Sequence, residues 1–187
     1  MVFVRVFRCL ALRGAGLLLA SAAACAQCPA DAAAPAGTLL SVGLPDRPMQ
    51  RYDRAQLDAL PRSELVARRT VGAAASAPAL EQQTRYAGWL LRDLLQRSLG
   101  SAAAERALRG AVIEAVATDS YRAVFSWGEL FNNAIAEQVL VIAAVDGQAL
   151  GSEQGPLALR SLSDLRPGPR HVRNLCALVV RLLPPGR

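Results

Sequence analysis

The chain has 187 residues, which suits one domain with a short leader, and 52% of them are hydrophobic, which argues against wholesale disorder. All 21 basic residues are Arg, so chemistry that needs a lysine amine, such as a Schiff base or a P-loop, is excluded. The formal net charge is +6, but no Arg-rich block interleaved with aromatic residues follows the leader, which argues against nucleic-acid binding.

Residues 1–26 are predicted to be a signal peptide. An apolar stretch at 14–24 and an A-x-A cleavage site at 24–26 follow a basic start with Arg5, Arg8 and Arg13. The apolar stretch is shorter than the ~20 residues of a membrane span, and no later segment is longer. Cys25 offers an alternative, because the residues before it loosely resemble a lipobox that leads to lipidation. We therefore expect the mature protein to be periplasmic or otherwise exported, with 18 Arg against 15 acidic residues.

The N-terminal part of the mature chain is predicted to contain a tether and then two strands around a helix. Residues 27–37 are rich in Ala and Pro, which is typical of a flexible tether. Strands are expected at 38–43 and 64–71. Between them, 54–60 is expected to form two helical turns, with Asp53 as the N-cap and Pro61 as the stop.

A predicted loop and then a helix follow these strands. The Ala- and Ser-rich segment 72–83 is predicted to be a loop. A stripe of leucines predicts a helix over 89–99, which Gly100 is placed to close. A short helix is expected over 101–109.

The C-terminal half is predicted to consist mainly of strands. Segments 111–117 and 121–125 indicate a hairpin, after which Ser126 caps a short helix. Further strands are expected at 139–145, where Asp146-Gly147 then forms a turn, at 157–162 and at 175–183. Because no regular βαβ alternation occurs, the predicted class is α+β, with mixed, mostly antiparallel β-sheets and short helices.

Two cysteines remain after the leader, Cys28 and Cys176. An oxidising compartment permits a disulfide between them. However, Cys28 lies in the predicted tether, and Cys176 alternates with Leu178 and Val180 along a strand. This alternation favours a buried free thiol for Cys176 over a disulfide.

Common enzyme signatures are missing from the sequence. His171 is the only histidine, which excludes a zinc site built from several histidines. No G-x-S-x-G nucleophile motif and no dinucleotide glycine fingerprint occur. A hydrolase built on Ser, His171 and Asp therefore has little support.

Five short patterns in the last hundred residues occur in a characteristic order, at 86–95, 116–126, 139–148, 153–157 and 170–175. Their order and spacing resemble the molybdopterin-binding domain of the sulfite oxidase family. The resemblance extends over residues 38–184 and implies a fold of that family. It also implies molybdopterin as a cofactor.

The resemblance further implies a set of cofactor-binding residues. In the family, the closing motif supplies backbone amides and a basic side chain to the pterin phosphate, which gives His171, Val172 and Arg173 this role here, helped by Arg170. An arginine that the family places after Gly-Pro is Ala158 in this chain. Arg160, two residues on and on the same strand face, is predicted to replace it. The competing interpretation makes Arg170 and Arg173 solvated loop charges.

The metal site of the family lacks its ligand in this chain. Catalytic members have a molybdenum-binding cysteine after the strand equivalent to 64–71, whereas 70–86 contains no cysteine. Neither Thr70 nor Ser76 can replace a thiolate on a soft metal. Arg68 and Arg69 lie where the family has an arginine beside the metal. The resemblance therefore implies pterin binding without molybdenum.

Two functional hypotheses follow. The first is an exported molybdopterin-dependent-oxidoreductase-like domain that is degenerate, so that it binds a pterin or another anion without sulfite-type catalysis. The second is an exported, lipid-anchored module that senses a small anion or contacts a membrane-associated redox or sensor partner. The second hypothesis predicts a cleft lined by Arg173, Arg170 and Trp127. For the other aromatic residues, including Tyr86, core packing is expected.

Overall fold

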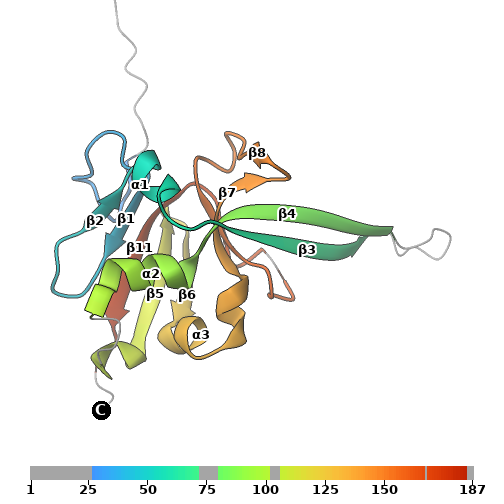
Figure 1. The fold of residues 1–187 in the computed structure, drawn as a ribbon. Helices are drawn as coiled ribbons and strands as arrows, with labels where there is room; N and C mark the ends of the chain where they lie inside the picture. Colours follow the sequence, from blue (N-terminus) through green and yellow to red (C-terminus); the bar gives the residue numbers. More distant parts are fainter. Residues whose placement is uncertain (1–26, 72–79, 102–105, 167, 185–187) are drawn as a thin grey trace, which may run out of the picture.

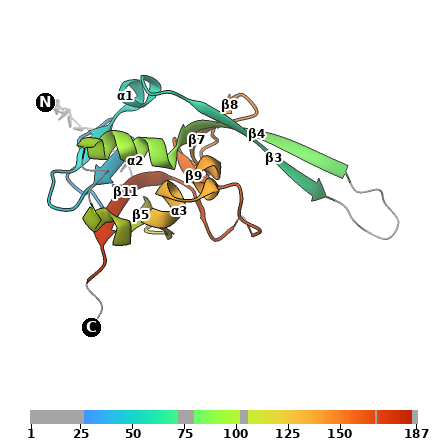
Figure 2. The same cartoon turned by 60° about the horizontal axis from the view of Figure 1, so that its bottom comes forward.

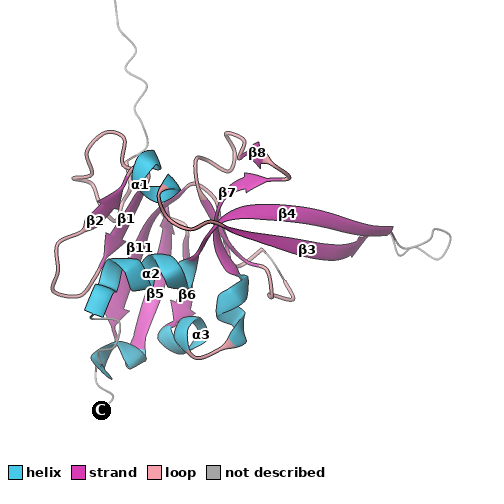
Figure 3. Ribbon diagram, viewed as in Figure 1, coloured by secondary structure: helices cyan, strands magenta, loops and turns pink. Residues whose placement is uncertain are grey.

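The computed structural model describes residues 27–71, 80–101, 106–166 and 168–184. The predicted signal peptide lies outside these residues. The described chain consists of two β-sheets with a few short helices (Figures 1 and 3). This is the predicted α+β class, with mostly antiparallel sheets.

The first sheet has five strands in the order β2-β1-β11-β5-β6. The β1 and β11 strands run parallel, and the other neighbouring pairs are antiparallel. The hairpin predicted from the sequence is β5–β6, and the predicted terminal strand is β11. The bounds of the five strands are β1 Leu40–Gly43, β2 Gln50–Tyr52, β5 Ala111–Ala117, β6 Arg122–Ser126 and β11 Leu175–Leu182.

The second sheet has the order β10-β9-β7-β4-β3, and β8 also pairs with β7. All of its pairs are antiparallel. Its short strands β8 and β10 arise from the turn at Asp146-Gly147 and from the closing motif. The bounds are β3 Ser63–Val71, β4 Leu80–Leu90, β7 Val139–Val145, β8 Gln148–Ala149, β9 Ala158–Ser161 and β10 His171–Val172.

The β3 and β4 strands of the second sheet form a hairpin whose outer part extends beyond the rest of the molecule (Figures 1 and 2). β4 pairs with β7 only over its last five residues, Tyr86 to Leu90, so the outer part of the hairpin has no such support. Residues 80–83, which were predicted to lie in a loop, belong to β4. The rest of that predicted loop, 72–79, lies outside the described residues.

The helices are short, and two have the N-caps predicted from the sequence. Asp53 and Ser126 each form a capping box, because the side chain of the third helical residue returns a hydrogen bond to the cap. No helix in the described part of the chain has the length and hydropathy that crossing a membrane requires. The helices are α1 Arg54–Asp58, α2 Leu91–Leu99 and α3 Trp127–Phe131, with 3-10 turns η2 Arg106–Gly110 and η3 Ala134–Gln138.

The α2 helix begins two residues later than predicted. Trp89 and Leu90 continue β4, since they pair with Val141 and Leu140 of β7. Gly100 closes the helix with a positive φ of 57°, as predicted. The leucine stripe is therefore divided: Leu91 and the leucines after it face the main core, whereas Leu90 belongs to the other face of the sheet.

The main core contains side chains from both sheets and from α2. Its largest fully buried members include Leu40, Trp89, Leu94, Ile113 and Phe125. A second apolar group, here called the outer cluster, lies on the opposite face of the second sheet. It consists of Tyr86, Leu90, Leu140 and Ile142, with partly buried neighbours. β7 serves both groups, because its alternate side chains point to opposite faces.

Trp127 belongs to the main core, so the prediction that it lines a cleft is wrong. Its side chain is only 4% exposed, and its ring stacks on that of Phe131 at 3.9 Å between centroids. The capping box at Ser126 starts the helix at Trp127 and turns its ring inward. The cleft of Arg173, Arg170 and Trp127 is therefore not present.

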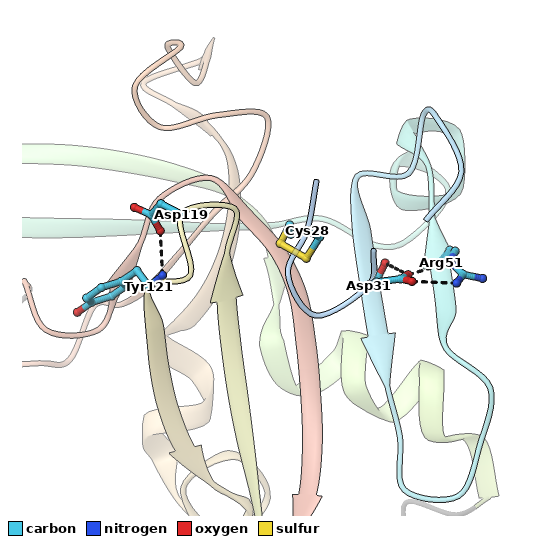
Figure 4. The surroundings of a disulfide bond; sticks show 7 residues. Cys28, Asp31, Arg51, Asp119 and Tyr121 are labelled. Carbon is cyan, nitrogen blue, oxygen red and sulfur yellow. Dashed lines mark hydrogen bonds and ion pairs between the residues drawn. A yellow bond between two sulfur atoms is a disulfide. The ribbon is translucent and has the colours of Figure 1, made fainter. Parts of the chain in front are cut away.

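A disulfide joins Cys28 to Cys176, which are 148 positions apart in the sequence, so the favoured prediction of a free thiol is wrong (Figure 4). The physical reason is a β-bulge in β11 between Leu175 and Ala177. Because the bulge interrupts the alternation of side chains, Cys176 does not share the face of Leu178. It packs instead in a small cluster with Cys28.

The segment 27–37 differs from the flexible tether that its composition predicts. Besides the disulfide, the buried carboxylate of Asp31 accepts hydrogen bonds from Ser41 at 2.7 Å and from Arg51 at 2.8 and 2.9 Å (Figure 4). The hydrogen bond from Arg51 lowers the pKa of Asp31 below its usual value. These contacts attach the segment to β1 and β2.

Gly88 occupies a position in β4 where the backbone of β7 approaches closely. The register of the two strands shifts between Ala87 and Gly88, and a Cβ at Gly88 would lie 1.9 Å from the carbonyl oxygen of Val141. No side chain can fit there without moving β7. This explains in physical terms the glycine of the pattern at 86–95.

We expect Gly88→Ala to destabilise the protein by about 2 kcal/mol or more, because the methyl group must displace backbone atoms. Urea denaturation followed by circular dichroism measures the change. Gly110→Ala is the matched control, since a Cβ at Gly110 meets no atom within 4 Å. Equal stability of the two variants would contradict the close approach.

Removal of the disulfide is expected to lower the free energy of unfolding by about 2–5 kcal/mol, because it closes a long loop. The variant is Cys28→Ser with Cys176→Ser. Dithiothreitol should bring the wild type to the stability of this variant and leave the variant unchanged. The prediction is wrong if the wild type keeps its free energy of unfolding in dithiothreitol although a thiol assay shows that the disulfide is reduced.

Candidate functional site

A cavity of about 250 Å³ opens beside the outer cluster of the second sheet. Strands β4, β7, β9 and β10 line it, together with the chain after β8. We call it the Arg160 pocket. Its lining residues are Tyr86, Ile142, Val145, Ala149, Leu150, Gly151, Gln154, Ala158, Arg160 and His171.

Arg160 brings a half-buried positive charge to this pocket. Its Nη1 donates a hydrogen bond of 2.6 Å to the hydroxyl of Tyr86, and its guanidinium carbon lies 5.4 Å from the centre of the Tyr86 ring. Its Nε is buried and makes no hydrogen bond to any described residue. None of the residues that line the pocket is acidic. Arg160 also lines a second pocket with Asp164, but that carboxylate is paired with Arg170, and the guanidinium forms no ion pair with a described residue.

His171 faces Arg160 across the β9–β10 pair. Its Nε2 lies 3.1 Å from Oε1 of Gln154, and because an amide oxygen can only accept, this pair requires the tautomer with hydrogen on Nε2. Burial lowers the pKa of His171 below 6.5, and the positive charges of Arg160 and Arg173 lower it further. His171 is therefore neutral at pH 7.

The turn that carries Gln154 is fixed by the closing motif. The amide of Asn174 donates to the carbonyl of Gln154 at 2.7 Å, and the amide of Leu175 donates to that of Leu157 at 2.9 Å. Gly155 has a φ of 73°, and a Cβ there would lie 2.3 Å from Asn174 Oδ1. The Gly-Pro pattern and the closing motif thus pack together, which places Gln154 beside His171.

Two of the five predicted cofactor-binding residues, Arg160 and His171, line the pocket together. Ala158 lines it as well, so Arg160 does share the strand face of the position it was predicted to replace. Val172 is buried in the main core, on the other face of β10. Arg173 is exposed and makes no hydrogen bond or ion pair to a described residue, although its charge reaches His171.

Arg170 is held by two carboxylates away from the pocket. It forms a two-armed ion pair with Asp164, and its Nη1 lies 2.9 Å from Glu129 Oε1. The hydrogen bonds that Arg170 donates to Asp164 are the main reason why the pKa of Arg170 is raised. Its guanidinium also lies 4.8 Å from the ring centre of Phe125. These contacts give Arg170 a structural role, since its charge is already neutralised.

Tyr86 and Gln154 were not among the residues predicted for the site. Tyr86 was assigned to core packing, and its ring is indeed only 9% exposed, but its hydroxyl reaches the pocket. One sequence feature bears on the position of Tyr86: because strand side chains alternate, Tyr86 lies on the same face of β4 as Gly88, where β7 approaches closely. The turn bond from Gln154 to Gly151 is local, but the contact with residue 174 that places Gln154 beside His171 is long-range and has no local signal.

The described residues offer no group of three or more His, Cys, Asp or Glu side chains that could hold a metal ion. Both cysteines of the described chain are in the disulfide. Arg68 lies 3.7 Å from Glu81 on the hairpin, in an exposed ion pair. Ser76 lies outside the described residues, and so does the side chain of Thr70.

Comparison with known proteins finds a similar fold but no matching family. No family model matches the sequence, and no curated protein matches it. The fold is similar to part of the crystal structure of the sulfane dehydrogenase SoxCD from Paracoccus pantotrophus, with a TM-score of 0.51 and 17% sequence identity. The similarity covers 75% of this chain and 37% of that chain, so this protein spans well under half of its structural relative. At this identity the likeness shows the fold alone, and it agrees with the fold class implied by the sulfite oxidase resemblance.

Arg170→Gln is expected to destabilise the protein by about 2 kcal/mol at pH 7, because it leaves two partly buried carboxylates without their cation. Hydrogen bonds from Arg170 lower the pKa of Asp164; for Glu129, burial alone would raise the pKa, but bonds from Ser126 and Arg170 outweigh it. Their stabilising contribution is present above about pH 4 and is lost as the pH falls through the lowered values.

The deficit of Arg170→Gln should therefore shrink between pH 7 and pH 3, which urea denaturation at several pH values measures. Arg109→Gln is the control, because Arg109 is exposed and makes no ion pair to a described residue. A deficit that stayed constant with pH would argue against the paired carboxylates as its cause.

Proposed function

We propose that the protein is an exported, degenerate relative of the molybdopterin-dependent oxidoreductases that binds a small oxyanion in the Arg160 pocket without sulfite-type catalysis. The observation that supports this most is the half-buried guanidinium of Arg160, whose Nε has no partner among the described residues. A cation removed from water without a counter-charge costs free energy, which a bound anion would offset.

The donors around Arg160 suit an oxyanion. The hydroxyl of Tyr86 accepts from Arg160, so its own hydrogen is available to a ligand. His171 supplies no further donor, because its Nε2–H is engaged with Gln154. The phosphate of a pterin and a free small anion share this chemistry, since both offer oxygen acceptors with negative charge.

The residues fit the phosphate of molybdopterin better than they fit the rest of this cofactor. The cavity of about 250 Å³ is below the roughly 300–1,000 Å³ of pockets that enclose larger ligands. A soft metal needs a thiolate, and both cysteines of the described chain are consumed by the disulfide. The strand after which the family has its cysteine, β3, ends at the far end of the projecting hairpin (Figure 1). We therefore derive no redox step from a molybdenum centre.

The disulfide supports the proposed export, because such bonds form and persist in oxidising compartments. Lipid attachment at Cys25 remains the alternative to cleavage after Ala26. A membrane-associated redox or sensor partner stays a prediction from the sequence.

Binding is tested by isothermal titration of the purified exported protein with acetate, sulfate, phosphate and a phosphorylated pterin. At least one of these should bind, and Arg160→Met should abolish that binding while leaving the protein folded. Because Met removes an unpaired half-buried charge, we also expect this variant to be more stable than the wild type without ligand. Arg109→Met, which changes an exposed arginine, should leave both properties unchanged.

The absence of molybdenum chemistry is tested on protein from a host that makes the cofactor. Metal analysis should find far less than one molybdenum per chain. Stoichiometric molybdenum, or anion binding that survives Arg160→Met, would contradict the proposed function.

A further inference from the structure

The Arg160 pocket is lined by both polar and aliphatic side chains. Tyr86, Gln154, Arg160 and His171 supply the polar groups. The aliphatic residues lie among them, since Val145 is paired with Tyr86 across the strands and Ala158 precedes Arg160 by two residues; they are Ile142, Val145, Ala149, Leu150 and Ala158. Ile142 and Ala158 are at most 1% exposed, so they belong to the folded sheet. A ligand that contacts both kinds of side chain needs a charged head and an apolar body.

The charge of the pocket matches a single negative charge. Arg160 is the one lining residue that is always cationic, while burial and the nearby arginines lower the pKa of His171 opposite it and favour its neutral form. Glu153 and Arg173 in the neighbouring turns are exposed, so water screens them. A dianion such as sulfate would carry a second charge into a partly desolvated site that offers it no partner.

The geometry of the head group favours a carboxylate. One arm of the guanidinium, Nη1, donates to Tyr86, and Nε is closed to solvent, so Nη2 is the arm left for a ligand. The hydrogen of the Tyr86 hydroxyl provides a second donor beside it. Two such donors match the two oxygens of a carboxylate.

The size of the cavity limits the body of the ligand. At the ~30 Å³ that a molecule occupies in liquid water, a volume of about 250 Å³ has room for roughly eight non-hydrogen atoms. A carboxylate uses three of these atoms. The remainder corresponds to a short aliphatic chain along Ile142, Val145 and Leu150.

From these observations we infer that the ligand is an aliphatic monocarboxylate of roughly six to eight non-hydrogen atoms, with its head at Arg160 and its chain along the aliphatic lining residues. This inference rests on the proposed anion binding and names the class of anion. The head group neutralises the unpaired guanidinium, and the chain contacts the aliphatic lining residues.

The test is isothermal titration of the purified exported protein with straight-chain carboxylates from acetate to octanoate. The dissociation constant should fall roughly fourfold for each added methylene, as for a buried CH₂ group, until the chain fills the cavity near pentanoate or hexanoate. Pentanol lacks the charge and phosphate lacks the chain, so each should bind at least tenfold more weakly than pentanoate. Norvaline adds an ammonium group for which no lining residue offers an acid, and it should bind more weakly too.

Two variants separate the head from the chain. Ala149 is exposed at the rim of the pocket, so Ala149→Leu should keep the fold and move the optimum to a chain one or two carbons shorter. Tyr86→Phe keeps the ring and removes the donor, so it should weaken every carboxylate about tenfold without moving the optimum.

The outcomes distinguish this inference from the proposed function. If phosphate or sulfate binds as tightly as pentanoate, or if Ala149→Leu leaves the optimum unchanged, the carboxylate class is wrong and anion binding stands. If no anion in either series binds, both proposals are wrong.

Discussion

The constraint on which the site depends is the burial of one guanidinium without a carboxylate beside it. The fold keeps Arg160 partly out of water through the pairing of β9 with β7 and β10. Its compensation comes from the hydroxyl and ring of Tyr86 and from the neutrality of His171. This compensation is weaker than an ion pair, so the empty site stores unfavourable free energy that a matching anion can release. Binding and fold stability are therefore linked at this residue.

The contrast with Arg170 shows that neighbouring carboxylates decide whether an arginine is available to a ligand. Arg160 lies in β9 and Arg170 directly precedes β10, the strand paired with it, and the family resemblance assigned both arginines to one cofactor site. Arg170, however, forms ion pairs with Asp164 from its own loop and with Glu129 from α3, so its charge is neutralised within the fold. Glu129 is 41 residues away, and no local pattern predicts that contact. Residue type thus indicated two candidate anchors, and only tertiary packing distinguished them.

Local rules predicted most of the elements. Periodicity and turn chemistry located β5–β6, β7, β11 and both N-caps, because these depend on residues close together in the chain. Long-range effects account for the differences: pairing with β7 extends β4 into the expected helix, and the bulge in β11 redirects Cys176 toward Cys28. Of the site, Arg160 and His171 were found through the family resemblance. Gln154 was missed because its position beside His171 depends on a long-range hydrogen bond from the backbone of Asn174.

The position of the β3–β4 hairpin bears on the redox chemistry that the family resemblance implies. In the family that the sequence resembles, one segment both follows the strand equivalent to β3 and carries the metal thiolate. Here β3 and β4 form a hairpin that points away from the body of the protein (Figure 2), and the pocket on the second sheet is lined by polar and aliphatic side chains around one arginine. Such groups suit the recognition of an anion, which is the role we propose for this scaffold.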